Sequence, residues 1–156
     1  LTEDADQGLE LAQLVDRLTV RFGAGAVFSI QNRASHIPER AESLTAPLAA
    51  SGGTPAPLVD RPVRFVDHPE EVQVLYAVPE GPPAQFIWRR QTHQVARYQG
   101  PERIAPEWWQ DRPGTRLRDY FKVEDQTGRR FWLYREGLHD DRRGGAPRWF
   151  LHGMFA

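Results

Sequence analysis

The sequence contains no cysteine among its 156 residues. This excludes disulfide bonds, thiolate metal sites and cysteine nucleophiles, and it is compatible with a reducing, cytoplasmic setting. No apolar run approaches the ~20 residues of a membrane-spanning helix, and no signal peptide is recognisable. The formal net charge is −1, which argues against a dedicated nucleic-acid domain. The chain begins at Leu1 rather than Met, so we interpret it as a piece of a longer protein.

Turn-forming and aromatic residues are abundant. There are 13 prolines and 13 glycines, and aromatic residues make up 11% of the chain. This composition suits a compact β protein with many turns better than a helical bundle. We predict an α+β, mainly β fold: an antiparallel sheet or small barrel of about seven short strands, preceded by one N-terminal amphipathic helix and a short strand.

The clearest local pattern is a β-hairpin over residues 120–135. Two alternating, aromatic runs flank a three-residue turn at 126–128, where Gly128 supplies the left-handed residue. The register pairs Phe121 with Leu133 and Val123 with Phe131 on one face, and Tyr120 with Tyr134, Lys122 with Trp132 and Glu124 with Arg130 on the other. The second set predicts an aromatic pair, a cation over an indole and an ion pair. Because this second face is unusually aromatic, either another layer covers it or a partner binds there.

Three segments follow from composition and periodicity. Residues 1–43 contain a helix over 6–22 and a short strand over 26–30; the helix carries one apolar stripe made of Leu11, Leu14, Val15, Leu18 and Phe22. Residues 44–59 are rich in Ala, Pro, Gly, Ser and Thr, which predicts a linker. Residues 60–156 form a β-rich domain, with further strands over 62–66, 72–78, 85–89, 93–99 and 148–155, a turn over 79–83, and irregular chain over 100–118 and 137–147.

Residues capable of catalysis do not occur in catalytic spacing. His139-Asp140-Asp141 is the best metal candidate, but a solvated loop tip explains it better. His152 is better explained as a hydrogen-bonded sheet histidine than as a general base. No serine lies in a nucleophile elbow, and Gly23 and Gly25 follow a helix instead of preceding one, the reverse of a phosphate-binding loop. We therefore predict a protein that is not an enzyme and has neither a metal nor a cofactor.

Two groups of residues are candidates for binding macromolecules. Tryptophan and arginine dominate binding hot spots, so Trp108, Trp109, Arg103, Trp132 and Tyr134 are the predicted protein-binding residues. Within the Trp108-Trp109 pair, either one ring is exposed as an anchor or both pack under the loop. The alternative is a nucleic-acid platform whose basic rim comes from Arg89, Arg90, Arg129 and Arg130. Given the near-zero net charge, solubilising turn residues are the favoured explanation of these arginines.

Several motifs point to a known family. These are Tyr98-Gln-Gly-Pro-Glu-Arg-Ile-Ala-Pro-Glu-Trp-Trp109, Arg118-Asp-Tyr-Phe-Lys-Val-Glu-Asp125, Arg130-Phe-Trp-Leu-Tyr-Arg135, Arg148-Trp-Phe-Leu-His-Gly153 and, before the linker, Ser35-His-Ile-Pro-Glu-Arg-Ala41. Together they resemble the C-terminal region of the ImuB family, the Y-family-polymerase-like subunit of the bacterial translesion mutasome. The resemblance covers nearly the whole chain except the linker.

The resemblance carries functional expectations. ImuB-type proteins lack the catalytic acidic residues of lesion-bypass polymerases and act as hubs in DNA-damage-induced mutagenesis. The expected partners are an ImuA-type RecA-like protein and an error-prone C-family DNA polymerase, in the bacterial cytoplasm at the nucleoid. Gln13-Leu-Val-Asp-Arg-Leu18 has an Asp where a clamp-binding peptide needs an apolar residue, so we expect the sliding clamp to bind upstream. A DNA-contacting module and a purely structural domain remain the alternatives.

Overall fold

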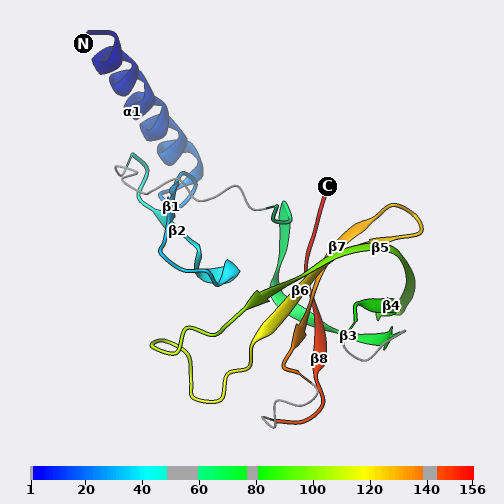
Figure 1. The fold of residues 1–156 in the computed structure, drawn as a ribbon. Helices are drawn as coiled ribbons and strands as arrows, with labels where there is room; N and C mark the ends of the chain where they lie inside the picture. The colour runs from blue at the N-terminus through cyan, green and yellow to red at the C-terminus, as the bar shows by residue number, and fades with distance from the viewer. Residues whose placement is uncertain (1, 49–59, 77–80, 139–143) are drawn as a thin grey trace. The chain divides into compact units, whose positions relative to one another are not determined.

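The computed structural model describes residues 2–48, 60–76, 81–138 and 144–156 (Figure 1). The chain divides into two compact units, Leu1–Leu58 and Val59–Ala156. Each unit is described by itself.

The first unit combines the predicted helix with a small sheet. Helix α1 spans Thr2–Phe22, β1 spans Ser29–Asn32, the 3-10 turn η1 spans Pro38–Arg40 and β2 spans Glu42–Thr45. The helix ends at Gly23, which has φ 97° and donates its N–H to the Thr19 carbonyl at 2.9 Å. β1 pairs with β2 in an antiparallel two-stranded sheet. The linker prediction was therefore wrong at residues 44 and 45, which lie in β2, and residues 49–59 fall outside the described chain.

The second unit is a closed antiparallel barrel. Its strands are β3 (Arg64–Tyr76), β4 (Pro83–Trp88), β5 (Gln91–Ile104), β6 (Arg118–Asp125), β7 (Arg130–Glu136) and β8 (Arg148–Met154). Each strand pairs with the next along the chain, and β8 pairs with β3 to close the barrel (Figure 1). This confirms the predicted small, mainly β architecture with one leading helix.

The β6–β7 hairpin has the predicted register at all five predicted pairs. Its turn is closed by the Gly128 N–H, which donates to the Asp125 carbonyl at 3.0 Å, and Gly128 has φ 83°. The side-chain contacts differ from the prediction. The cation above Trp132 is Arg61, at 4.8 Å, whereas Lys122 lies 4.4 Å above the Phe155 ring. Arg130 donates to the Ala156 carbonyl and not to Glu124.

Three other sequence predictions were wrong, and each reflects an irregularity in pairing. The strands predicted at 62–66 and 72–78 are one strand, β3, whose register with β8 shifts between Phe65 and Glu70. Residues 100–104, predicted to be irregular, continue β5 through a second shift between Gln99 and Glu102. Strict alternation along the predicted 148–155 strand places Met154 on the face opposite that of Trp149 and Leu151. In β8 a register shift opposite Trp132 and Leu133 reverses the alternation, so Met154 packs on the core with them. A single extra residue in a strand has this effect because side chains alternate with a period of two.

The inner face of the barrel forms the core. It contains eight buried residues from five strands: Val72, Phe86, Phe121, Val123, Phe131, Leu133, Trp149 and Leu151. The apolar face predicted for the β6–β7 hairpin supplies half of them. The core is thus built from the same alternation that identified the hairpin in the sequence.

Part of the outer face of β6, β7 and β8 is covered by the start of β3 and the chain that leads into it. We call Tyr120, Trp132, Tyr134 and His152 the aromatic outer face. The Phe65 ring stands edge-on to Trp132 at 5.7 Å and to His152 at 5.2 Å. Pro62 is buried, and Arg61 lies above Trp132. Of the two explanations for this aromatic surface, the structure supports a covering layer.

Gly153 allows this layer to sit close to β8. A Cβ atom at this position would lie 2.6 Å from Pro62 Cγ and 2.9 Å from the Arg64 carbonyl oxygen. We expect Gly153→Ala to lower the free energy of unfolding by about 2 kcal/mol, because backbone must move to relieve the contact. Gly145→Ala is the matched control, since no atom lies within 4 Å of its Cβ position. Urea unfolding followed by tryptophan fluorescence measures both, and equal midpoints would refute this packing.

Candidate interaction surfaces

A hydrogen-bonded turn after β5 presents two exposed tryptophans. The backbone N–H groups of Gln110 and Asp111 donate to the Glu107 carbonyl at 2.8 and 2.7 Å, and the Glu107 N–H donates to Asp111 Oδ2 at 2.7 Å. Trp108 and Trp109 lie within this turn with 83% and 57% of their surface exposed. Their rings meet edge to face at 5.8 Å. We call this segment, residues 107–111, the Trp turn.

The Trp turn is fixed to the barrel on its N-terminal side. Glu107 is fully buried, and Ile104 at the end of β5 is buried as well. The turn is therefore held at its base while both indole rings face outward. The sequence left open whether one ring or neither would be exposed, and in the structure both are.

Arg103, the third predicted binding residue, is part of an ion-pair row across β5, β6 and β7. Its guanidinium makes two hydrogen bonds to Asp119, at 2.7 and 2.9 Å, and is about half exposed. Asp119 also accepts a hydrogen bond from Arg135 Nη2 at 2.9 Å, and both of these side chains are buried. Burial would raise the pKa of Asp119, but the bonds from Arg103 and Arg135 outweigh it and the pKa is lowered.

Trp132 and Tyr134 lie in the aromatic outer face and are only 3% and 4% exposed. Trp132 stacks on Tyr120 at 4.1 Å, and Arg118 lies 5.0 Å above the Tyr134 ring. In this arrangement they support the barrel wall and offer little surface to a partner. Sequence reasoning selected them because aromatic residues serve both binding and packing.

Of the four arginines of the predicted basic rim, three have partners. Arg89 makes two hydrogen bonds to Glu70, at 2.6 and 3.1 Å, and lies 4.7 Å from the Trp88 ring centroid. Arg129 binds Asp125, and Arg130 donates to the Ala156 carbonyl. Arg90 is exposed in the turn between β4 and β5. These contacts match the simpler explanation of solubilising turn residues.

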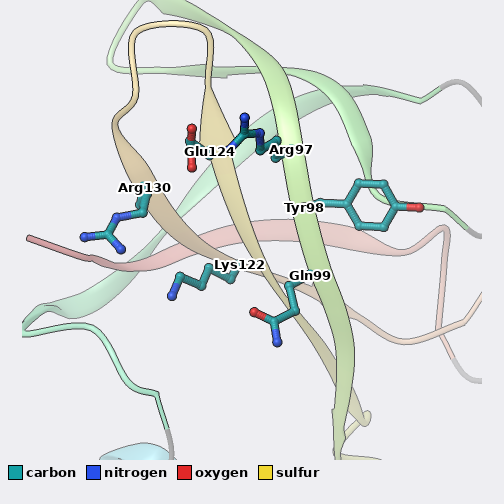
Figure 2. A pocket seen from close by; sticks show the side chains of 6 residues that line it. All are labelled: Arg97, Tyr98, Gln99, Lys122, Glu124 and Arg130. Atoms are coloured by element: carbon teal, nitrogen blue, oxygen red, sulfur yellow. The ribbon is translucent and has the colours of Figure 1, made fainter.

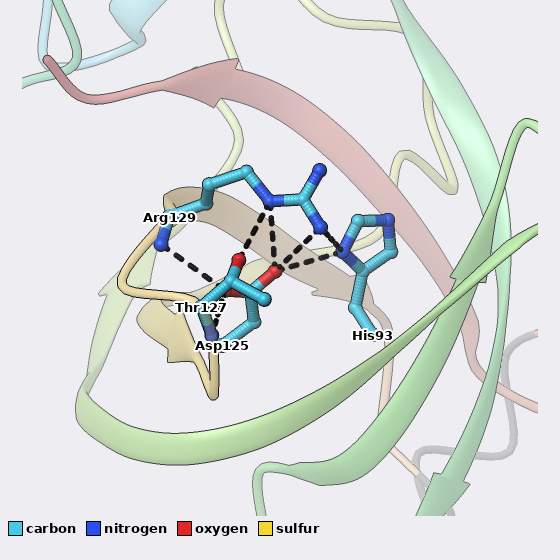
Figure 3. A network of polar contacts seen from close by, with 4 residues as sticks. All are labelled: His93, Asp125, Thr127 and Arg129. Carbon is cyan, nitrogen blue, oxygen red and sulfur yellow. Dashed lines mark hydrogen bonds and ion pairs between the residues drawn. The ribbon is translucent and has the colours of Figure 1, made fainter.

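Sequence reasoning missed a polar network beneath the β6–β7 turn (Figure 3). Asp125 accepts hydrogen bonds from the Thr127 N–H and hydroxyl at 2.9 and 2.6 Å, and from the Arg129 N–H and Nε at 3.1 Å. His93 Nδ1 lies 3.0 Å from Asp125 Oδ2. Burial would raise the pKa of Asp125, but these hydrogen bonds, first those from Thr127 and His93, lower it strongly. An Asp two residues before a Thr is an Asx-turn signal, and it was the available clue.

Histidine–carboxylate pairs also occur in catalytic sites, but this one is structural. The His93 ring is buried, stacks on Phe86 at 4.7 Å and meets Phe131 at 4.9 Å. Its Nε2 atom is buried and has no hydrogen-bond partner among the described residues. A general base must reach the proton that it removes, and core side chains surround this ring.

The other candidate histidines do not form a metal or catalytic centre in the described chain. The His152 Nδ1 and the Tyr120 hydroxyl are 2.9 Å apart within the aromatic outer face, as expected for a hydrogen-bonded sheet histidine. His139, Asp140 and Asp141 fall outside the described residues. Among the residues that are described, no group of three or more His, Asp or Glu side chains could hold a metal ion. No helix in that part of the chain is long and apolar enough to cross a membrane.

Comparisons with known proteins agree with the motif-based resemblance. The chain is 43% identical over 159 residues to Protein ImuB from Caulobacter vibrioides strain NA1000, and equally to Protein ImuB from strain ATCC 19089 of the same species. Each match covers 93% of this chain and 33% of the relative, so the chain spans about a third of their length and corresponds to their C-terminal region. No solved structure matches significantly. Residues 59–155, which contain all six strands of the barrel, match the family described as Domain of unknown function (DUF6504), and the chain belongs to this family.

Proposed function

We propose that the barrel is a non-catalytic protein-interaction domain of an ImuB-type hub protein, and that the Trp turn is its contact with a partner. The process is DNA-damage-induced translesion synthesis and mutagenesis, in the bacterial cytoplasm. The partner is the ImuA-type RecA-like protein, the error-prone C-family polymerase, or both. The exposed Trp108–Trp109 pair carries this proposal, and the 43% identity to ImuB supports the process.

The energetics of the Trp turn favour a protein partner. Aromatic side chains bury roughly 150–250 Å² each when they are covered, and tryptophan is enriched at hot spots. Single exposed apolar residues are common on protein surfaces, but two adjoining indole rings make a large apolar projection. Because the turn is already hydrogen-bonded and anchored by buried Glu107, a partner would lose little free energy in ordering it.

The proposal predicts a loss of partner binding when both rings are removed. We expect Trp108→Ala with Trp109→Ala to weaken binding to the RecA-like protein or the C-family polymerase at least 30-fold, about 2 kcal/mol. Isothermal titration of the full chain with each purified partner measures this. Leu75→Ala is the control, because Leu75 is an exposed apolar residue of β3 outside the Trp turn.

Two outcomes would contradict the proposal. If the full chain binds neither partner, the interaction role is wrong. If it binds a partner with equal affinity in the double variant, another surface makes the contact. Circular dichroism of the variant establishes that the barrel is intact, since both rings are exposed and their removal leaves the core unchanged.

A further inference from the structure

A pocket of about 190 Å³ lies against β5, β6 and β7 (Figure 2). Its lining residues are Arg97, Tyr98, Gln99, Lys122, Glu124 and Arg130, and we call it the cationic groove. In Figure 2 five of these side chains lie on one side of β5, whereas Tyr98 is directed to the other side.

The strand register brings the cations together from three strands. Arg97 on β5 is opposite Glu124 on β6, and Glu124 is opposite Arg130 on β7. Two residues further along β5, Gln99 is opposite Lys122 on β6. Residues that are directly opposite share a face of the sheet, so these side chains form two adjoining rows.

The charge of the groove differs from that of the chain. Three cations and one carboxylate line it, an excess of two positive charges on a chain whose net charge is −1. Arg97 is exposed and has no polar partner among the described residues. Lys122 is paired with Asp60, whose side chain is 67% exposed, and Arg130 with the carbonyl of exposed Ala156. An incoming anion can replace such solvent-exposed partners at little cost.

The groove continues into a second hollow of about 450 Å³. The two share Gln99 and Lys122, and the second extends along Gly100 and Pro101. It also contains the carboxylates of Asp60 and Glu102, which are paired with Lys122 and Arg61. Two adjoining hollows suit an extended chain better than a single small anion.

Tyr98 adds an aromatic surface next to the cations. Its side chain is 59% exposed. β4 pairs with β5 only at Gln91–Gln94, so from Val95 onward β5 has no described strand on its other side. A flexible, extended ligand that lies over Arg97 can therefore cross the open edge of β5 and reach the Tyr98 ring.

We propose that the cationic groove binds the phosphodiester backbone of single-stranded nucleic acid, with a base stacked on Tyr98. Cations that follow the backbone and an aromatic ring for a base are the two parts of such sites. An acidic peptide would satisfy the cations but has no planar group for Tyr98. The site is separate from the Trp turn, and it includes Arg130 but not Arg89 or Arg90 of the predicted rim.

Fluorescence anisotropy of the full chain with a labelled oligothymidylate of about 16 nucleotides tests the proposal. We expect binding at about 50 mM salt that weakens steeply toward 200 mM. Arg97→Gln should weaken binding at least fivefold and lower the slope of log affinity against log salt by about 0.7, the value for one lost phosphate contact. Tyr98→Ala should weaken binding at least fivefold with the slope unchanged, because stacking releases no counterion.

Arg90→Gln is the matched control, since it removes an exposed arginine outside the groove and should leave both affinity and slope unchanged. Competition distinguishes the ligands: unlabelled oligothymidylate should displace the probe, whereas inorganic phosphate and polyglutamate at equal charge should not. Three results would overturn the proposal: no binding at low salt, equal effects of Arg97→Gln and Arg90→Gln, or polyglutamate that competes as well as the oligonucleotide. The Trp108→Ala, Trp109→Ala variant should bind the probe normally, which separates this site from the proposed protein contact.

Discussion

Replacing Asp119 with alanine is expected to lower the free energy of unfolding of the barrel by about 3–5 kcal/mol. Asp119 is fully buried and accepts hydrogen bonds from both Arg103 and Arg135. Arg135 is only 2% exposed, so without this carboxylate its charge stays in the interior with less compensation. The loss would be large against the roughly 5–15 kcal/mol that stabilises a typical domain. Arg103 would also lose its ion pair with β6. It directly precedes Ile104, the buried last residue of β5, after which the chain leads to the Trp turn.

Urea unfolding at pH 7 measures this effect, and tryptophan fluorescence is a specific probe because all five tryptophans lie between residues 88 and 149, in the barrel. Glu102→Ala is the control: its pair with Arg61 is partly exposed, with side chains 45% and 27% accessible, and should contribute at most about 1 kcal/mol. Asp119→Ala combined with Arg135→Met should recover part of the stability, because removing both charges of a buried pair is less damaging than removing one. If Asp119→Ala lowers the free energy of unfolding no more than Glu102→Ala does, the ion-pair row of Arg103, Asp119 and Arg135 does not stabilise the barrel.

The sequence predicted the strand register and the turn of the hairpin because local and tertiary signals agreed there. Gly128 determined the turn, and one register satisfied both faces of residues 120–135. The helix was equally clear from its apolar stripe. In both cases the pattern is contained within one short stretch of chain.

The errors arose where pairing departs from regular alternation. β3, β5 and β8 each contain a register shift. The position of such a shift is set by pairing with the neighbouring strand, so the sequence of one strand does not reveal it. For the same reason the cation above Trp132 could not be foreseen: Arg61 reaches it from a segment 71 residues away in the chain (132 − 61). The sequence indicated which residues are aromatic and charged, but not which distant side chain would meet each of them.

The candidate sites also differ in whether local sequence or contacts between distant residues determine them. The sequence left open whether one of the Trp108 and Trp109 rings or neither would be exposed, and the structure exposes both, since neighbouring residues in a turn are not constrained by strand alternation. Trp132 and Tyr134 were selected by residue type. Residues 60–65 cover Trp132, whereas Tyr134 packs against Tyr120, Phe150 and Arg118. The cationic groove was not predicted because Arg97, Lys122 and Arg130 come from three strands, and only Arg130 had been selected, as part of the basic rim.

Lowering the pH should destabilise the barrel through Asp125, and Asp125→Asn should remove much of this dependence. The pKa of Asp125 is depressed in the folded protein, so its carboxylate contributes stability that is fully present above the unfolded-state pKa of about 4 and is lost as the pH falls below it. At pH 7 the Asn variant should be less stable by about 3 kcal/mol, because Thr127, Arg129 and His93 then face a neutral amide.

Unfolding midpoints at pH 7, 5, 4 and 3 distinguish this network from general acid sensitivity. We expect the stability difference between the original chain and Asp125→Asn to be constant from pH 7 to 5 and to shrink at pH 4 and 3, since there Asp125 of the unfolded original chain takes up a proton that the folded chain does not bind. Asp67→Asn is the control, because Asp67 is exposed and makes no polar contact with the described residues. A difference that stays constant down to pH 3 would mean that the carboxylate charge is not what holds the turn, and that hydrogen-bond geometry alone positions Arg129 and, beside it, Arg130 of the cationic groove.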